Sequence, residues 1–210
     1  SGTGASSPDS SLSFTYSYSL GGAEHFQHMR GCRATSGTLS VSRGVWEQSM
    51  TFIAKDITIP NTSTGDGGSP TYQTAETTSS PIVHSDGGGN PFTWNSVNYG
   101  ERSFSTTVSR NMAVMAVNGE NDITYTKAND RSITFTADVF AGTASNTTSM
   151  YTDYEGKTKR AASYKFTSSP SKTLTYANAI ITDCSQTHAA GSTDALIESI
   201  SCRAESCTNL

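Results

Sequence analysis

The chain uses one alternating pattern twice: Ser-Met-Thr-Phe-Ile-Ala-Lys-Asp at residues 49–56 and Ser-Ile-Thr-Phe-Thr-Ala-Asp-Val at residues 132–139. A Val-Ser-Arg stretch stands before each copy, at residues 41–43 and 108–110. Apolar and small polar residues alternate in both copies, which is the period of a half-buried β-strand. Each copy is expected to pair with the strand-like run before it. Because a two-stranded ribbon is marginal by itself, two similar ribbons suggest sheets that continue into neighbouring copies of the chain.

The composition favours an all-β protein. The chain has 210 residues, which fits one domain or at most two. Only 34% of the residues are hydrophobic and 15% are charged, and 33 Ser and 31 Thr make up much of the rest of the chain. Thr favours strands and Ser favours turns, and the nine Tyr and eight Phe argue against a disordered tract. We expect mainly antiparallel sheets of the sandwich or barrel-forming kind, with one short helix.

Charge and hydropathy exclude two classes of protein. The formal net charge is −4 and the chain shows no basic patch, so a sequence-specific DNA-binding protein is not expected. No apolar run approaches the roughly 20 residues that a membrane-spanning helix needs, so no membrane partner is expected.

Three segments are predicted from local composition. Residues 1–11 are rich in Ser and Gly and are expected to form an arm, and residues 12–183 are expected to form the β domain. Leu, Phe and Tyr alternate with Ser and Thr over residues 12–20, which predicts a strand, whereas residues 23–33 look less regular. Residues 60–91 read as a long connection rich in Gly, Ser, Thr and Pro. Residues 184–210 form a cysteine-containing C-terminal segment.

The second half is predicted to hold further strands around the helix. Ser, Thr and Asn precede spaced apolar residues within residues 145–162, which predicts one short helix. Strand-like runs follow at residues 163–168, 172–183 and 195–202.

The sequence offers no catalytic or cofactor site. It contains no Gly-x-Ser-x-Gly elbow and no phosphate-binding Gly-Lys-Ser/Thr loop, so an enzyme is not expected. His25, His28 and Cys32 are a fragment of a metal-site pattern, but structural metal sites use three or four ligands with supporting partners, and we expect no metal. Four aromatic residues could form a sugar-stacking surface, although ordinary sheet core is the stronger interpretation: Tyr16, Tyr18, Trp46 and Trp94.

The chain has four cysteines, and their pairing stays open. Four thiols allow three intramolecular pairings. The residues are Cys32, Cys184, Cys202 and Cys207. Disulfides within or between subunits, in a particle that ends outside the cell, are one hypothesis, and free thiols are the other. A cross-link between subunits would appear as a ladder on non-reducing gels that collapses with reductant.

The order of these elements resembles that of phage tail tube proteins. The resemblance rests first on residues 28–32 and 37–44, where a Gly-containing stretch leads into a strand and a Gly-marked turn. Residues 46–56 then look like the outgoing strand of the family. The later segments are residues 91–94 with 102–112, residues 130–137 as their partner, and residues 172–181 as a late strand. The resemblance covers residues 12–183. Two features depart from the family: the connection at 60–91 is long, and the cysteine-rich tail after Ile181 has no counterpart in the family.

The resemblance implies a structural role. Members of this family form hexameric rings that stack into a hollow tube, and the sheets of neighbouring subunits join into a continuous β-barrel. Double-stranded DNA passes through the channel during ejection, after the tape-measure protein leaves, and a sheath surrounds the tube in contractile tails. The subunit would be part of the virion tail, assembled in the host cytoplasm. Phe52, Phe104 and Phe135 would mark the assembly strands.

Two other functions compete with this interpretation. A secreted β-sandwich adhesin or carbohydrate-binding module would stay monomeric and expose aromatic side chains. A β-fold hydrolase would need a nucleophile motif or clustered acid pairs, which the sequence lacks. Assembly into rings or tubes would separate the first interpretation from these two.

Overall fold

The computed structural model describes residues 12–21, 23–42, 45–58, 91–116, 123–140, 144–168, 171–187 and 197–208. The predicted arm and residues 60–90 of the predicted long connection lie outside this part of the chain. Within it the chain forms a 12-stranded sheet and one helix, so the predicted all-β fold class is confirmed. The described helix is too short and too polar to cross a lipid bilayer.

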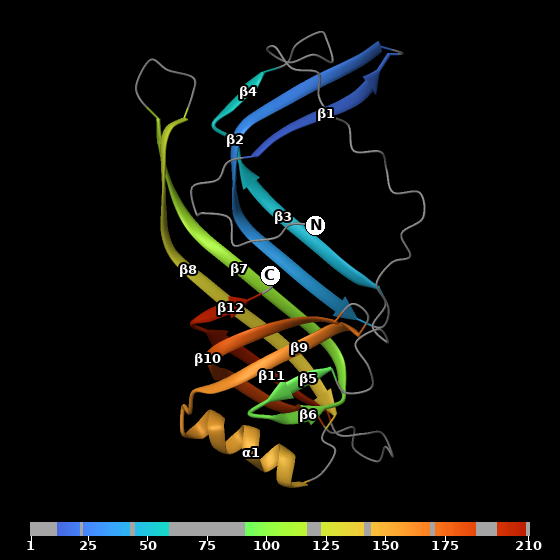
Figure 1. The fold of residues 1–210 in the computed structure, drawn as a ribbon, viewed down its shortest axis with the longest axis vertical. Helices are drawn as coiled ribbons and strands as arrows, with labels where there is room; N and C mark the ends of the chain where they lie inside the picture. Colours follow the sequence, from blue (N-terminus) through green and yellow to red (C-terminus); the bar gives the residue numbers. More distant parts are fainter. Residues whose placement is uncertain are drawn as a thin grey trace. The chain divides into compact units, whose positions relative to one another are not determined.

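Figure 1 labels the elements. The strands are β1 (Leu12–Leu20), β2 (Ala23–Ser42), β3 (Trp46–Ile53), β4 (Asp56–Thr58), β5 (Phe92–Trp94), β6 (Val97–Tyr99), β7 (Glu101–Ala116), β8 (Ile123–Phe140), β9 (Arg160–Ser168), β10 (Ser171–Thr187), β11 (Ile197–Ala204) and β12 (Ser206–Thr208), and the helix is α1 (Ala144–Glu155). The sheet order is β1-β2-β7-β8-β11-β10-β9-β5-β6, with β3 and β4 on β2 and β12 on β10. Both repeat copies therefore pair with the strand before them, as predicted.

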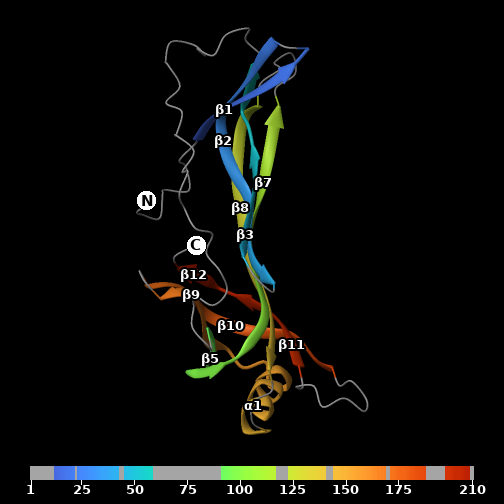
Figure 2. The same ribbon diagram turned by 90° about the vertical axis from the view of Figure 1, so that its right-hand side faces the viewer.

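The chain folds as two compact units. Unit 1 comprises Ser1–Ser36, Met50–Ser79 and Arg110–Asp130, and unit 2 comprises Gly37–Ser49, Ser80–Ser109 and Arg131–Leu210. The long strands β2, β7 and β8 contribute residues to both units. In unit 1 the antiparallel ribbon of β1 and β2 is visible in both views (Figures 1 and 2).

Strand β2 corrects the expectation for residues 23–33. The segment is regular sheet and belongs to a single strand of 20 residues. Its irregular appearance in the sequence comes from a bulge: Leu12 pairs with Cys32, but Phe14 pairs with Met29. Gly31 lies at this bulge with φ of +59°, a conformation that favours Gly. A Cβ at Gly31 would also come within 2.8 Å of Lys55 Cβ.

Unit 2 holds the hydrophobic core. The Phe104 ring on β7 stacks on Tyr164 of β9 with 4.1 Å between centroids, and the Phe135 ring on β8 lies 4.4 Å from that of Tyr176 on β10. In the sheet order β7 is not next to β9, and β8 is not next to β10. The sheet of unit 2 must therefore curl so that its two ends face each other across these rings, as in a sandwich. The predicted boundary after residue 183 falls inside β10, and β11 and β12 complete the sheet.

The two repeat copies have different surroundings. From Ile133 to Val139 of β8 every second side chain is buried, with Phe135 and Val139 1% or less exposed. In β3 most side chains are exposed, and Met50 is 50% exposed. The expectation of two half-buried copies with alternating burial is correct for the second copy and wrong for the first, because only the second lies beneath the strands that curl over the core.

Candidate assembly surfaces

The face of unit 2 opposite the core is covered with hydroxyl groups. Alternation along β7, β8 and β11 sends one set of side chains into the core and the other set outward. The outward set, all exposed or half-buried, is Ser103, Ser105, Thr107, Ser109, Ser132, Thr134, Thr136, Asp138, Ser199, Ser201 and Arg203. We call this set the hydroxyl face. It lies on adjacent strands, since β11 pairs with β8 and β8 with β7.

Hydrogen bonds fix the hydroxyl face in place. The Asp138 carboxylate accepts a hydrogen bond from Ser103 Oγ at 2.7 Å and another from Ser199 Oγ at 2.6 Å. Asp138 thus ties the two flanking strands to β8. On β2 and β7, Thr38 Oγ1 and Thr107 Oγ1 share a hydrogen bond of 3.0 Å. These hydrogen bonds hold five side-chain groups, four of them on the hydroxyl face, in defined positions against their partners.

The hydroxyl face carries little charge. Asp138 is its carboxylate and Arg203 its guanidinium, and the exposed Asp183 of β10 lies beside it because it pairs with Ser201. A surface binds DNA phosphates tightly when many Lys and Arg side chains release condensed counterions. One guanidinium beside two carboxylates gives this face little grip on a phosphate backbone.

The sheet presents edges as well as a face. Strand β11 pairs with the C-terminal half of β8, Ile133–Phe140, and leaves the N-terminal half without β11. Strand β3 lies beside β2, and within the described residues β2 is its pairing partner. Edge strands left open are templates for pairing with another chain.

The residues expected to mark assembly strands lie in different surroundings. The side chains of Phe104 and Phe135 are each 1% exposed and pack in the core of unit 2. Phe52 is half-buried in unit 1, where its ring meets that of Phe14 edge-on at 4.8 Å. The side chains of Phe104 and Phe135 therefore stabilise the core. Any contact of these strands with a neighbouring copy would be made by other side chains or by backbone groups.

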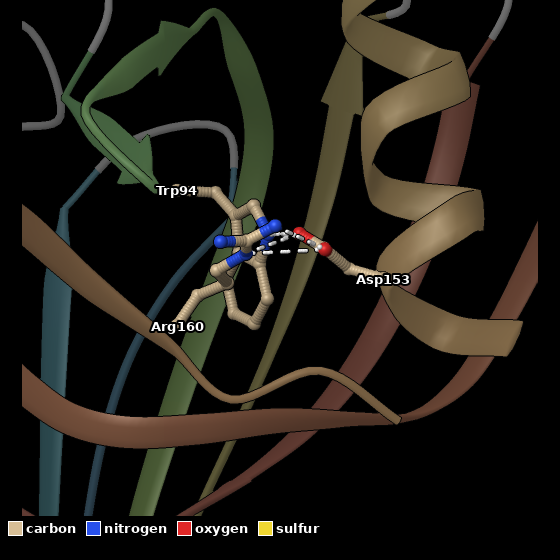
Figure 3. Close-up of polar contacts among 3 residues, drawn as sticks. All are labelled: Trp94, Asp153 and Arg160. Atoms are coloured by element: carbon tan, nitrogen blue, oxygen red, sulfur yellow. Dashed lines mark hydrogen bonds and ion pairs between the residues drawn. The ribbon is translucent and has the colours of Figure 1, made fainter. Parts of the chain in front are cut away.

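A buried carboxylate fastens α1 to the sheet of unit 2 (Figure 3). Asp153 of α1 accepts hydrogen bonds from Trp94 Nε1 at 3.0 Å, from Arg160 Nε at 3.1 Å and from a terminal Arg160 nitrogen at 2.9 Å. Trp94 lies on β5 and Arg160 begins β9. The hydrogen bond to Asp153 raises the pKa of Arg160 above its usual value. One side chain of α1 thus contacts two strands.

Comparison with known proteins identifies the family of this β-sheet protein. A model of the phage tail tube protein family matches residues 1–204. The chain belongs to the phage tail tube protein family. Among solved structures, Hcp1 from Flavobacterium johnsoniae is similar over 58% of this chain and 95% of its own, at 17% identity and a TM-score of 0.35. No curated protein matches the chain.

In this tail tube protein all four cysteines are free thiols. Cys32, Cys202 and Cys207 are buried, and Cys184 is half-buried and donates a hydrogen bond of 3.1 Å to Glu198 Oε1. Burial raises the pKa of Cys207 to about 11, and burial together with the Glu198 bond raises the pKa of Cys184 to about 12. Both thiols are therefore protonated and weakly nucleophilic at neutral pH. Disulfide cross-links between subunits stay a prediction for the assembled particle.

The metal-like fragment is split by strand geometry. His25 stacks on Tyr18 with 5.4 Å between ring centroids, whereas His28 Nδ1 shares a 2.8 Å hydrogen bond with Thr15 Oγ1. Because His25 and His28 differ by an odd number of positions along β2, they point to opposite faces. Across the described residues no group of three His, Cys, Asp or Glu side chains is arranged to hold a metal.

Two of the four aromatic residues of the sugar-stacking alternative belong to the core of unit 2 in this tail tube protein. Trp94 is 1% exposed and Trp46 packs against that core, whereas Tyr16 and Tyr18 lie on β1. Sequence reasoning missed two polar centres: the partners of Asp138 are 35 and 61 residues away, and Asp153 joins the nearby Arg160 to Trp94, which is 59 residues away. Glu198 could have been found, because alternation in β11 places it on the same face as Ile200 and Cys202.

Proposed function

We propose that this protein is the repeating subunit of a phage tail tube, in which hexameric rings stack into a hollow conduit and the hydroxyl face lines the channel for DNA. The observation that carries the proposal is the hydroxyl face itself. A sealed aromatic core lies behind it, so the face is free for solvent. Its hydroxyl groups hold water, and its low content of cations lets a phosphate backbone slide past.

The sheet edges support ring closure. If the outer edge of β3 in one subunit pairs with the N-terminal half of β8 in the next, the contact is heterologous, and such contacts generate rings when the rotation closes. A closed barrel leaves no free edge. Hexameric symmetry follows from the family resemblance.

The channel would hold the tape-measure protein before ejection and double-stranded DNA during it. If the tail is contractile, the outer surface of the tube would face a sheath. Assembly would take place in the host cytoplasm, without a membrane step. No residue acts as a catalyst in this function, since the work of the subunit is mechanical.

Electron microscopy of the purified protein tests the assembly. We expect rings or hollow tubes in negative stain, with six-fold symmetry in averaged end views. Particles that remain monomeric at high concentration would favour the secreted binding module instead.

Cysteine labelling tests which face lines the channel. Thr136 lies on the hydroxyl face and Thr175 on the outward side of β10, and both side chains are exposed. The variants Thr136→Cys and Thr175→Cys should both react with a bulky polyethylene-glycol maleimide as free subunits. In tubes only Thr175→Cys should react, with the wild type as the blank for native thiols. Equal labelling of Thr136→Cys in tubes would place this face outside the channel.

A further inference from the structure

Strand β11 carries an ionisable side chain among apolar ones. Its core-facing side chains are those of Glu198, Ile200, Cys202 and Ala204, since burial alternates along the strand. Glu198 is 0% exposed. Its Oε1 accepts a hydrogen bond of 3.1 Å from the Cys184 thiol of β10, whereas its Oε2 has no hydrogen-bond partner among the described residues. Because a buried charge is costly unless it is paired and fully hydrogen-bonded, these surroundings favour the neutral carboxyl.

Within the described part of the chain, the sheet around Glu198 offers it no positive charge. The side chains that pair with it, bond to it or lie within its electrostatic reach are Val139, Gln186, Cys184 and Tyr99. Burial and the Glu198 bond raise the pKa of Cys184 to about 12, and burial with the charges of Glu198 and Asp153 raises the pKa of Tyr99 to about 12 as well. Both groups are therefore neutral at neutral pH. A second buried carboxylate, that of Glu101 on β7, accepts a hydrogen bond of 2.5 Å from the Tyr164 hydroxyl instead.

Helix α1 adds negative charge to the same region. The helix packs on β10, and its Met150 is buried in the core cluster that includes the β11 neighbours of Glu198. Asp153 of α1 acts on the same β6 hydroxyl as Glu198 does, and it engages the Arg160 guanidinium through three hydrogen bonds (Figure 3). The remaining ionisable side chains of α1 are exposed or half-buried: Tyr151, Tyr154 and Glu155. Ionisation of Glu198 would therefore place an unpaired charge near a helix that already carries Asp153, and like charges in a low dielectric repel strongly.

The helix is the element of this region that moves most easily. Strand β11 is fixed by backbone hydrogen bonds on both sides, since it pairs with β8 and β10. By contrast, α1 is attached to the sheet through side chains such as Met150 and Asp153, and its sequence is rich in the weak helix formers Ser, Thr and Asn. Local opening begins at the elements with the fewest such constraints. Release of α1 is therefore the least costly way to let water reach a charged Glu198.

We propose that α1 is a proton-controlled lid: the neutral Glu198 carboxyl keeps α1 seated on the core of unit 2, and its ionisation favours a second state in which α1 is released. The inference concerns the single subunit and does not rest on the tube function. Burial raises the pKa of Glu198 above its ordinary value of 4.5, against the smaller opposite effect of the Cys184 bond. The seated state therefore has its full advantage below pH about 4.5, and it loses this advantage as the pH rises through the raised folded-state value.

Hydrogen exchange of the full-length dissociated subunit from pH 4 to 8 tests the lid. After correction for the intrinsic pH dependence of exchange, protection of the α1 amides should fall by up to about tenfold per pH unit once Glu198 ionises, while the amides of Ile133–Val139 on β8 stay protected. Glu198→Gln keeps an acceptor for the Cys184 thiol but cannot ionise, so its α1 protection should not depend on pH. The control Asp183→Asn removes an exposed carboxylate next to Cys184 and should behave as the wild type does. Equal pH profiles of the wild type and Glu198→Gln, or loss of protection in β8 together with α1, would overturn the inference.

A measurement on the wild type alone covers the case in which Glu198→Gln does not fold. Carbon-detected NMR follows the Glu198 carboxyl, and the methyl resonance of Met150 reports whether α1 is seated, since Met150 is 0% exposed. We expect the Met150 methyl to move toward the shift of a solvent-exposed Met with the same midpoint pH as the Glu198 carboxyl. A Met150 methyl that keeps its buried position throughout the Glu198 titration would mean that α1 stays seated and that there is no lid.

Discussion

Glu198 shows how a single residue can conflict with its surroundings. Its side chain is fully buried on the core face of β11, where Glu198 Oε1 accepts the Cys184 thiol hydrogen. Its second oxygen has no hydrogen-bond partner among the described residues. Burial raises the pKa of Glu198 above its ordinary value of 4.5, against the smaller opposite effect of the thiol. The core therefore favours the neutral carboxyl.

The raised pKa of Glu198 predicts a loss of stability with rising pH. A group with a raised folded-state pKa contributes its full stability below the unfolded value, and this contribution falls as the pH rises through the folded value. Relative to Glu198→Gln, the wild type should lose free energy of unfolding above pH about 4.5, at up to about 1.4 kcal/mol per pH unit. Denaturant titrations of the dissociated subunit from pH 4 to 9 would measure this. Parallel curves for both proteins would contradict it.

Sequence could identify residues whose partners are set by local alternation, and it missed those that depend on distant strands. The pattern of β11 marks Glu198 as buried. By contrast, Asp138 accepts hydrogen bonds from Ser103 of β7 and Ser199 of β11, and these two strands lie far apart in the sequence. No local spacing in the sequence could have indicated these two hydrogen bonds.

Among the elements, α1 depends on its contacts with the sheet of unit 2. Its sequence is rich in Asn, Ser and Thr, which are weak helix formers. Short helices with such sequences gain most of their stability from tertiary packing. In α1 that packing centres on the buried Met150 and on Asp153.

Removal of the Asp153 carboxylate should loosen α1. Asp153→Ala leaves the buried Trp94 Nε1 without its acceptor, and an unsatisfied buried group costs about 1–3 kcal/mol. We expect that loss in denaturant unfolding, together with faster amide exchange in α1. Glu155→Ala, which changes an exposed residue of the same helix, is the control. Equal behaviour of the two variants would mean that the helix is held by other contacts.

The repeated strands should differ sharply in what they contribute to stability. Phe135 of β8 is 1% exposed, and truncation of a buried Phe costs about 3–5 kcal/mol. Phe52 stands at the same position of the first copy but is only half-buried, so Phe52→Ala should cost the subunit about 1 kcal/mol. Unfolding of the dissociated subunits would show the difference. Similar losses would mean that the copies are buried alike.

Most strands could be predicted because their alternation is clear, and β1 was predicted with its observed bounds. The short strands β4, β5, β6 and β12 have three residues each, which is too few for a period to appear. Burial of the first repeat copy was mispredicted because alternation shows which side chains share a face, but not what covers that face.

At the scale of the molecule, the two units differ in what their described side chains bury. The core cluster lies in unit 2, whereas most of the exposed large apolar side chains of the described residues belong to unit 1. The family and the element order could be recognised from sequence. The division into units could not, since β2, β7 and β8 run through both without any break in composition that would mark a boundary.

The bulge at Gly31 limits how this protein can evolve. Before it the even-numbered residues of β2 pair with odd-numbered residues of β1, as His28 does with Thr15, whereas beyond it the even-numbered Cys32 pairs with Leu12, so even-numbered side chains change face at the bulge. The extra residue acts as a phase shift within one strand. Deletion of Gly31 would restore strict alternation and turn one half of the strand inside out. Related chains should therefore gain or lose residues here only in pairs, or with a compensating change elsewhere in β2.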